Sequence, residues 1–541
     1  MNATKDIIIA SLQEALDKMN VSKSIILTES KTHGDYATNL ALTLAKDLNK
    51  KPMDIANEIV KNIDLKKYSE ISNIEVAAPG FINFWISNSV LADIVNTIIK
   101  LGDHYGDLSK EGKGAINVEW VSANPTGYLH IGHARNAAVG ATLCSILEKA
   151  GHRVVREYLV NDYGNQMNNL AASLFARYQQ IWNKDFPMPE DGYNGGDIVE
   201  FAQEYYEEIK DKYKDVEYTD EIRQIFRQKG RDIALKNINK DLARFGISFD
   251  LYTSETEQYQ KDLVWPAIRR LKNVYVQDGA TWLKTTEGGY DDKDRVIIKS
   301  NGDSTYFCAD IAYHDQKMAN LNDPVNGKII DVWGADHSGY IERVKYSFVD
   351  LGWRRDQLEI IALQLIRVIK DGKEMKMSKR LGTSLTMREM LDLVGKDAMR
   401  FFLIDRSYNS KIDFDVKKVL SADESNPMYI IKYAHARCAQ LLKKVNEENL
   451  LAEEYTDEFA QKLVNDLKEY PDLIATMAKT YKVNLLAPYL LKLARSFNSF
   501  YSNTRILNTD KEKNYAALVK ATKIVLANGL GLMGIESPEK M

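Results

Sequence analysis

Two short motifs in the chain carry side chains that suit the phosphates of a nucleotide. Residues 130–133 read His-Ile-Gly-His, and residues 376–380 read Lys-Met-Ser-Lys-Arg. When a carboxylate attacks the α-phosphorus of ATP, negative charge spreads over the phosphoryl oxygens and the leaving pyrophosphate, and positioned donors and cations supply most of the catalysis. Taken singly, the motifs fit helix-capping or core histidines and a solvated basic loop equally well. Together and in this order, they predict activation of a carboxylic acid by ATP.

Each motif has its own expected role at the nucleotide. The imidazoles of His130 and His133 suit the α-phosphate and ring oxygens, while Lys376 and Lys379 suit the β- and γ-phosphates as mobile point charges. Gly132 has no side chain, so it lets the adenine ring approach the backbone closely. We therefore predict that the two histidines and the two lysines are catalytic, and that ATP arrives as its Mg²⁺ complex.

The residues around the first motif predict a βαβ unit. Residues 116–122 form a β-branched and aromatic run that ends in the loop residues 123–127. Apolar residues then recur at helical spacing up to Gly151, and a second strand pattern covers 154–160. Open parallel sheets bind ligands outside the carboxyl ends of their strands, which is where the two histidines are expected.

A second strand end adds Gly334 and Asp336, which follow the apolar run 329–333. Asp336 is expected to accept from ribose hydroxyls, to orient the amino acid, or to cap the next helix. The predicted ATP-binding residues are His130, Gly132, His133, Gly334, Asp336, Lys376, Met377, Ser378 and Lys379.

With these motifs the chain resembles a class I aminoacyl-tRNA synthetase, and longer strings resemble the arginyl-tRNA synthetases in particular. The strings are VEWVSANPTGYLHIGHARN at 118–136, GADHSGYIERVK at 334–345 and DAMRFFLIDRS at 397–407. The likeness extends to both ends, through GDYATNLAL at 34–42 and NGLGLMGIESPEKM at 528–541. The chain departs from the many arginyl enzymes that lack a clean second motif, because both of its lysines are present.

The resemblance implies a reaction and its partners. An enzyme of this family is an arginine–tRNA ligase, which activates L-arginine with ATP to arginyl-adenylate and pyrophosphate. It then transfers arginine to the 3′ end of tRNA(Arg) and releases AMP. The expected partners are therefore tRNA(Arg), L-arginine and ATP, and the resemblance implies that activation needs bound tRNA.

Carboxylates in the sequence suit a guanidinium substrate. Tyr306 and Asp310 are four residues apart in an expected helix and so share one face. Buried carboxylates such as Asp310 and Glu119 would reject an uncharged amino acid, because they would be left unpaired. The resemblance implies arginine-binding roles for Glu119, Asn124, His130, Tyr306 and Asp310. The region of the first motif comprises Ala123, Asn124, Pro125, Thr126, Gly127, Tyr128, Leu129, His130, Ile131, Gly132 and His133.

Composition and cysteine usage narrow the protein class. The net charge of −4 leaves a nucleic-acid partner undecided, because binding depends on local patches. No window approaches 18 uninterrupted apolar residues, and the start of the chain reads as an amphipathic helix, so we expect a cytoplasmic protein without a membrane partner. Cys144, Cys308 and Cys438 lack the spacing of a zinc site or a disulfide framework, which predicts buried thiols, no zinc and no protein-bound metal. We expect a monomer.

The pattern along the chain predicts three folded parts. We expect an α/β fold with a Rossmann-type parallel-sheet catalytic domain, an N-terminal α/β additional domain and a C-terminal all-α helical bundle. The resemblance implies that the additional domain contacts tRNA. The predicted bounds are 1–110 for the additional domain, 114–380 for the catalytic domain with a helical insertion near 170–260, 381–420 for a connecting segment and 421–541 for the bundle. The charged insertion is expected to be a solvated connective subdomain rather than a binding site.

The resemblance implies that the helical C-terminal region binds the anticodon. Single-stranded loops are read by bases stacking on aromatic side chains and by hydrogen bonds to splayed base edges. Tyr429 and Tyr433 share a helix face, and we expect one in the core and the other in contact with RNA. The candidates for tRNA contact are Tyr429, Tyr433, His435, Arg437, Tyr501, Asn503 and Arg505.

Two rival functions are weighed against this one. A nucleotidylyltransferase with the same histidine motif would use the same phosphate chemistry, but it would not need the long helical C-terminal region. A noncatalytic RNA-binding paralogue would not need both intact motifs.

Overall fold

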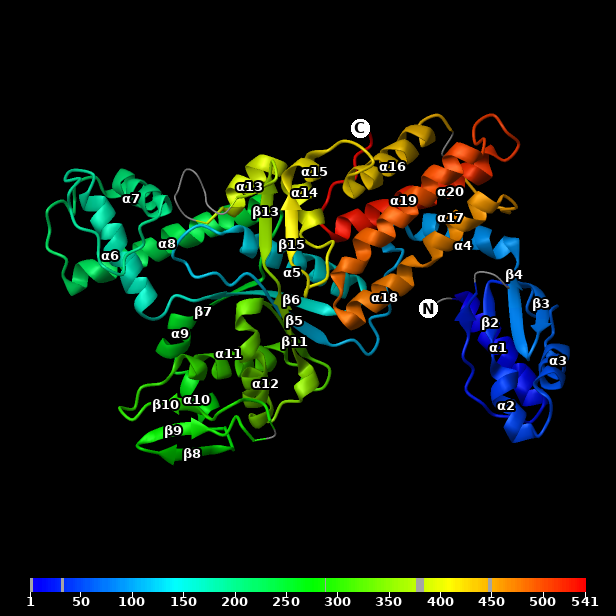
Figure 1. Ribbon diagram of the computed structural model, residues 1–541, viewed down its shortest axis with the longest axis horizontal. Coiled ribbons are helices and arrows are strands. Elements are labelled where there is room, and N and C mark those ends of the chain that lie inside the picture. The colour runs from blue at the N-terminus through cyan, green and yellow to red at the C-terminus, as the bar shows by residue number, and fades with distance from the viewer. Residues whose placement is uncertain (1–2, 31–33, 288, 376–383, 446–449) are drawn as a thin grey trace.

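The computed structural model describes residues 3–541 apart from 31–33, 288, 376–383 and 446–449 (Figure 1). Its centre is a five-stranded parallel sheet with the order β12-β11-β5-β6-β7. This sheet confirms the predicted Rossmann-type class. The strands are β5 (Ala115–Glu119), β6 (Arg153–Val160), β7 (Leu251–Ser254), β11 (Lys328–Gly334) and β12 (Leu358–Leu363).

Helices cover both faces of this sheet because its buried residues alternate between two cores. Ile330 and Ile361 face the core that contains α5, whereas their neighbours Ile329 and Ile360 face the core that contains α11 and α12. The three helices are α5 (Ile131–Lys149), α11 (Tyr306–Leu321) and α12 (Ile341–Asp350). At the crossing of α5 over the sheet, a Cβ on Gly140 would lie 2.3 Å from Cγ of the buried Trp120, so only glycine fits there.

Two inserted segments lie between strands of the central sheet. The first is a helical insertion with its own hydrophobic core, and it ends before β7, which belongs to the central sheet. Its helices are α6 (Asn165–Gln179), α7 (Gly196–Ile209) and α8 (Asp220–Arg244). The second, which the sequence patterns did not predict as a unit, holds α9 (Glu255–Gln260), α10 (Val264–Ile268) and the antiparallel strands β8 (Val274–Gln277), β9 (Ala280–Leu283) and β10 (Arg295–Ile298).

Residues 384–420, the described part of the expected connection 381–420, are packed into the protein. Strand β15 of this segment pairs in parallel with β13, so the segment completes a second small sheet with the order β14-β13-β15. The elements of this region are β13 (Ile366–Lys370), β14 (Lys373–Glu374), α13 (Met387–Val394), α14 (Lys396–Phe402), β15 (Ile412–Asp415) and α15 (Val416–Leu420).

The N-terminal unit is a four-stranded antiparallel sheet, β1-β2-β4-β3, covered by three helices. Its first strand is short and covers only Thr28 and Glu29. The following helix α4 packs on α17 and α20 of the C-terminal bundle instead of on this unit. The elements are α1 (Ala3–Lys18), β1 (Thr28–Glu29), β2 (Tyr36–Thr38), α2 (Leu40–Leu48), α3 (Pro52–Asn62), β3 (Ile71–Ala77), β4 (Phe81–Ile86) and α4 (Asn88–Leu101).

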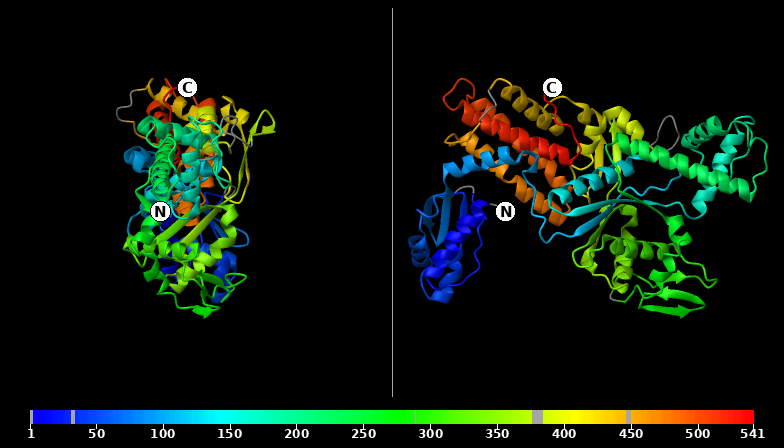
Figure 2. Two further views of the ribbon diagram at one scale, coloured as in Figure 1. Left: turned by 90° about the vertical axis from the view of Figure 1, so that its left-hand side faces the viewer. Right: turned by 180° about the vertical axis from the view of Figure 1, so that it is seen from behind.

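The C-terminal region is the predicted helical bundle. Figures 1 and 2 show the bundle above the N-terminal unit, which lies at the opposite end of the molecule from the helical insertion. The helices are α16 (Pro427–Leu442), α17 (Glu458–Lys468), α18 (Tyr470–Thr480), α19 (Leu486–Asn503) and α20 (Glu512–Leu532), and the short 3₁₀ helices of the chain are η1 (Gly102–His104), η2 (Ala335–Tyr340), η3 (Arg355–Gln357) and η4 (Val483–Leu485). In the described part of the chain, no helix has the length and apolar character that would let it cross a membrane.

Candidate active site

Backbone hydrogen bonds join the histidine motif to the residues that follow the lysine motif. His130 and Thr386 form an isolated antiparallel bridge. The amide of Ile131 donates to the carbonyl of Leu385 at 3.1 Å, and the amide of Met387 donates to the carbonyl of Leu129 at 2.7 Å. Residues 129–131 and 385–387, far apart in sequence, therefore meet at one place. Lys376, Met377, Ser378 and Lys379 themselves lie outside the described residues.

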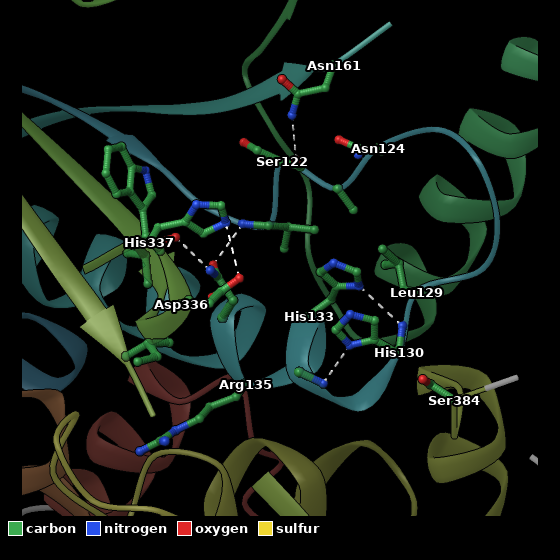
Figure 3. Close-up of a pocket in the computed structure, with 18 of the residues that line it drawn as sticks. Ser122, Asn124, Leu129, His130, His133, Arg135, Asn161, Asp336, His337 and Ser384 are labelled. Carbon is green, nitrogen blue, oxygen red and sulfur yellow. Dashed lines mark hydrogen bonds and ion pairs between the residues drawn. The ribbon is translucent and has the colours of Figure 1, made fainter. Parts of the chain in front are cut away.

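The two imidazoles stand side by side at the start of α5, with ring centroids 3.7 Å apart (Figure 3). His130 is the N-cap of the helix, and its Nδ1 accepts from the amide of Gly132 at 3.0 Å. Nδ1 of His133 accepts from the amide of His130 at 3.2 Å. Helix capping and a phosphate-binding role, weighed as alternatives in the sequence, are thus compatible in one residue.

These hydrogen bonds determine which ring nitrogen carries the proton. Because both Nδ1 atoms accept, each neutral ring carries its proton on Nε2. Desolvation lowers the pKa of His130, and it lowers the pKa of His133 to about 3, where the neighbouring His130 adds to the effect. Both rings are therefore neutral near pH 7 and have one N–H each to donate.

Gly132 serves the histidine pair directly. A Cβ at this position would lie 2.8 Å from Cε1 of His130, which is closer than side chains pack. The glycine thus admits the His130 ring, in addition to leaving the backbone open toward a ligand as expected.

The loop after β5 holds two residues in the left-handed region, Val121 at φ 67° and Ser122 at φ 39°. This conformation costs a β-branched residue on the order of 1–3 kcal/mol. The loop is held by Asn136, whose Oδ1 accepts from the amide of Val121 at 2.8 Å, and by Asn161, whose Nδ2 donates to the carbonyl of Ser122 at 3.0 Å. This kink turns the chain away from the strand end and toward the histidine motif.

A cavity of about 1300 Å³ opens at the carboxyl ends of the sheet strands. All the predicted arginine-binding residues line it, as do the predicted ATP-binding residues within the described part of the chain. The predicted residues that it brings together are Glu119, Asn124, His130, Gly132, His133, Tyr306, Gly334, Asp310 and Asp336.

Asp310 and Glu255 form the acidic side of the cavity. The hydroxyl of Tyr340 donates to Oδ2 of Asp310 at 2.6 Å, and burial raises the pKa of Asp310. Burial also raises the pKa of Glu255, to about 7, and the nearby carboxylates of Asp310 and Asp162 add to the rise. Tyr306, with 68% of its surface exposed, reaches the same cavity from the first turn of α11.

Glu119 is already paired inside the protein, contrary to the expectation that an uncharged amino acid would leave its carboxylate unpaired. It is buried at the end of β5, where its Oε2 accepts from Nζ of Lys317 at 2.6 Å and its Oε1 accepts from the hydroxyl of Ser122 at 2.8 Å. The same ammonium donates to Oδ1 of Asp331 at 2.6 Å. The expectation is corrected because a cation from α11 already neutralises this carboxylate inside the protein.

The Lys317 cluster continues to His314. Its Nε2 lies 2.8 Å from Oδ2 of Asp331, and its Nδ1 lies 2.7 Å from the carbonyl oxygen of Asp310. Burial works to lower the pKa of His314, but the hydrogen bond and charge of Asp331 outweigh it and raise the pKa. Since both ring nitrogens face oxygen acceptors, the doubly protonated ring fits this place.

Asp336 lies across the cavity from the histidines (Figure 3). Its side chain is exposed, and its Oδ2 lies 3.4 Å from Nε2 of His337. The residue that precedes the 3₁₀ helix η2 is Gly334, and within the described part of the chain the Asp336 side chain makes no capping hydrogen bond. The helix-cap alternative is therefore wrong for Asp336, which leaves its side chain available to a ligand.

Several cavity residues were missed in the sequence. Glu255 and Tyr340 each follow the end of a sheet strand, so their positions after β7 and β11 were a usable signal once those strands were recognised. Asn161 and Gln166 follow β6 in the same way. The side-chain Nδ2 of Asn124 donates to Oε1 of Gln166 at 2.7 Å.

Three family models match consecutive parts of the chain. The family model "tRNA synthetases class I (R), catalytic domain" matches residues 94–448, "Arginyl tRNA synthetase N terminal domain" matches 2–86 and "DALR anticodon binding domain" matches 431–541. An arginine–tRNA ligase of Metamycoplasma arthritidis is 69% identical over 100% of both chains, and one of Bacillus licheniformis is 41% identical over 99% of each. The chain belongs to the arginyl-tRNA synthetase family. It is an arginine–tRNA ligase of class I.

The fold of this arginyl-tRNA synthetase is that of a solved relative as well. The Thermus thermophilus arginyl-tRNA synthetase superimposes with a TM-score of 0.77 at 22% identity, covering 98% of this chain and 99% of that one. The likeness extends over all three parts of the chain, including the helical bundle.

In the bundle of the synthetase, three aromatic residues and an arginine form a surface that we name the tyrosine–arginine platform: Tyr429, Tyr433, Arg437 and Tyr501. The Tyr429 and Tyr433 rings stack with centroids 5.9 Å apart, and the Arg437 guanidinium lies 4.6 Å from the Tyr433 ring and 4.7 Å from the Tyr501 ring. Neither Tyr429 nor Tyr433 is in the buried core, so the expectation that one of them is a core residue is wrong.

The expectation that His435 contacts tRNA is also corrected. It is 2% exposed, and its Nδ1 lies 2.9 Å from the carbonyl oxygen of Pro538 in the C-terminal tail. Its ring therefore holds the tail and offers no surface to RNA. Asn503 and Arg505 are exposed near the end of α19.

Lys317 should be essential for stability. Replacing Lys317 with Met leaves Glu119 and Asp331 buried without their cation, and breaking a buried ion pair in this way costs about 3–5 kcal/mol. We expect a marked fall in the midpoint of thermal unfolding. Lys261→Met, at an ion pair with Glu257 on the surface, should leave the midpoint nearly unchanged. Equal effects of the two substitutions would contradict the role given to Lys317.

Proposed function

We propose that His130 and His133, together with Lys376 and Lys379, catalyse arginyl-adenylate formation. A carboxylate oxygen of arginine attacks the α-phosphorus of ATP, the bond from that phosphorus to the bridging oxygen breaks, and pyrophosphate leaves with the electron pair. No protein nucleophile or base is needed, because the substrate carboxylate is already ionised. The second step transfers the arginyl group to the 3′ end of tRNA(Arg) and releases AMP.

The observation that carries the proposal is the pair of Nε2 donors held by the backbone at the mouth of the cavity. Each ring has its Nδ1 tied to a main-chain amide, so its remaining N–H is oriented before a ligand arrives. Preorganised donors of this kind stabilise developing negative charge at little cost in reorganisation. Lys376 and Lys379 would neutralise the β- and γ-phosphates and the leaving pyrophosphate.

Arginine is placed with its guanidinium toward Asp310 and Glu255. A planar fork of N–H donors matches carboxylates in bidentate geometry, and both of these carboxylates line the cavity. Tyr306 lies beside them on α11, while Asn124 and His130 suit the α-amino and carboxylate end. Asp336 would accept from the ribose hydroxyls of ATP.

The remaining assignments follow from the chemistry of the donors. ATP would enter as its Mg²⁺ complex, because the triphosphate itself supplies oxygen ligands. We assign no zinc site, because the three thiols are buried on three different helices, α5, α11 and α16. Within the described residues, no cluster of three or more potential metal ligands is found. We propose that the synthetase acts as a monomer in the cytoplasm.

We propose that the tyrosine–arginine platform reads the anticodon loop of the tRNA. Its rings and guanidinium form a row of flat surfaces from α16 to α19, and successive unpaired bases stack on surfaces of this kind. Arg437 is fixed there by its donation to Oδ1 of Asn498 at 3.0 Å. Asn503 and Arg505 would supply polar contacts at one end of the row, and the N-terminal unit would contact the tRNA elsewhere.

The catalytic role of His133 can be separated from its capping role. Asparagine keeps an acceptor near the Nδ1 position but lacks the outward donor, whereas glutamine can place an N–H near the Nε2 position. We expect His133→Asn to lower kcat of ATP–pyrophosphate exchange by about 10²- to 10³-fold, with arginine KM little changed. His133→Gln should retain more activity. The proposal is wrong if the asparagine variant keeps wild-type kcat in the presence of tRNA(Arg).

Arginine affinity should depend on pH through Glu255. Its pKa of about 7 in the free enzyme means that it is partly protonated at neutral pH. The guanidinium stays charged and favours the ionised carboxylate, so binding releases a proton. Arginine KM should therefore fall as pH rises through about 7 and level off about one pH unit above it.

Glu255→Gln provides the test of this assignment. The variant should have a raised arginine KM that no longer changes over that range, while its ATP KM stays near the wild-type value. If the pH dependence survives in the variant, another group is responsible.

Arg437 should matter for tRNA and not for arginine activation chemistry. Losing one stacking surface costs about 1–3 kcal/mol per base. Arg437→Gln should therefore raise the tRNA(Arg) KM in aminoacylation by about 5- to 100-fold at an unchanged arginine KM. Arg495→Gln, at an exposed arginine of α19 outside the platform, is the control and should have little effect. Equal effects would mean that only net positive charge is read.

A further inference from the structure

The helical insertion contacts the histidine motif at Tyr128, two residues before His130. The hydroxyl of Tyr128 donates to Oε2 of Glu200 on α7 at 2.6 Å, and the Tyr128 ring meets Phe201 of the same helix edge-on, with centroids 5.3 Å apart. The amide of Tyr128 donates to Oδ2 of Asp197 at 3.4 Å. The insertion thus holds both the backbone and the side chain of this residue.

Arg388 contacts the same tyrosine from α13. Its guanidinium carbon lies 3.4 Å from the centroid of the Tyr128 ring, which is a close cation–π contact. Its Nε donates to Oδ2 of Asp241 on α8 at 3.0 Å, and its Nη2 donates to Oδ1 of Asn237 at 3.3 Å. The side chain of Asp241 is only 2% exposed, so this ion pair is largely shielded from water.

Backbone bonds place Arg388 next to the catalytic motif. The residue before it, Met387, donates to the carbonyl of Leu129, and Thr386 forms the bridge with His130. Residues 128–130 are therefore held by two sets of contacts. The first is the backbone hydrogen bonding to 386–387, and the second is the contact of the Arg388 side chain with Tyr128. Figure 1 shows α8 running from the insertion toward α13, where this contact is made.

We propose that Arg388 is a positioning residue for His130 and His133, and that the helical insertion is the brace that holds it. This inference rests on the catalytic roles proposed for the two histidines. It revises the expectation that the insertion is only a connective subdomain. Outward-facing ion pairs such as Lys236 with Glu204 fit that expectation, but Asp241 and Tyr128 do not.

Geometry explains why such a brace would affect the chemistry. The two Nε2–H groups stabilise the reacting phosphate only if they are aimed at it, and a misplacement of about 1 Å can cost about 10²-fold in rate. The chain at His130 enters the helix through Tyr128 and Leu129, so a shift of the tyrosine moves the first imidazole. Asp310 and Glu255, which would hold the guanidinium, lie on α11 and α9 and take no part in these contacts, so substrate KM should change less than the rate.

The structure provides a matched control in the same pair of helices. Arg244 of α8 forms an ion pair with Asp392 of α13, at side-chain exposures of 42% and 67%. This pair also joins the insertion to α13, but it makes no contact with Tyr128 among the interactions of the described residues. Arg388→Met and Arg244→Met therefore remove the same type of side chain between the same helices.

The experiment measures ATP–pyrophosphate exchange by the full-length enzyme with saturating tRNA(Arg), together with the thermal midpoint. We expect Arg388→Met to lower kcat by about 10- to 100-fold, with KM for ATP and arginine within about threefold of wild type. Arg388→Lys, which keeps the charge beside Asp241 and is the variant to use if the methionine protein does not fold, should recover part of kcat. Arg244→Met should keep wild-type kcat.

The outcomes separate the brace from simple stability and from the histidine roles. Wild-type kcat in both Arg388 variants would overturn the proposal, as would an equal loss in Arg244→Met or a change confined to arginine KM. His133→Asn is measured in parallel. If that variant loses kcat while the Arg388 variants do not, the brace alone is wrong; if His133→Asn keeps kcat, the proposed catalytic roles fail and the brace fails with them.

Discussion

The ammonium group of Lys317 allows two carboxylates to lie side by side beneath the active site. Asp331 of β11 and Glu119 of β5 are register partners in the parallel sheet, so both side chains emerge on the same face. Two adjacent buried anions would repel each other and would each lack water, which costs several kcal/mol per ion. Lys317, 1% exposed, neutralises both from α11. The register of the central strands and the position of α11 therefore depend on the charge of Lys317.

This constraint extends to the catalytic loop. Glu119 accepts from the hydroxyl of Ser122, and that hydroxyl oxygen accepts from the amide of Leu159 on β6 at 3.1 Å. Ser122 is one of the two residues held at positive φ in the loop after β5. The charge cluster therefore helps to maintain the kink that precedes the histidine motif. On the other side, His314 binds the carbonyl of Asp310 and so helps to place the carboxylate that faces the cavity. The same buried charge cluster therefore supports both the phosphate side and the amino-acid side of the site.

Sequence reasoning reached the parts of this arrangement that are local in the chain. The βαβ unit and the helical bundle have clear periodic patterns, and the histidine motif follows the loop after a predicted strand. Lys317 and His314 could not be recognised, because a lysine in a helix ordinarily points to solvent and its partners lie on strands paired only in the folded protein. Glu255 was missed because β7 is only four residues long. His435 was misassigned because the C-terminal tail that covers it leaves no trace in helical spacing.

The charge balance of the site offers a physical reason for arginine selectivity. Within the buried cluster, Lys317 and a protonated His314 offset Glu119 and Asp331. Among the described residues, no cation forms an ion pair with Asp310 or Glu255, so these two carboxylates face the cavity uncompensated. An uncharged amino acid would desolvate them without pairing them, which is the strongest form of rejection open to a binding pocket. A lysine substrate would bring charge but not the planar fork that two carboxylates can share, so the guanidinium satisfies the pocket better than either competitor.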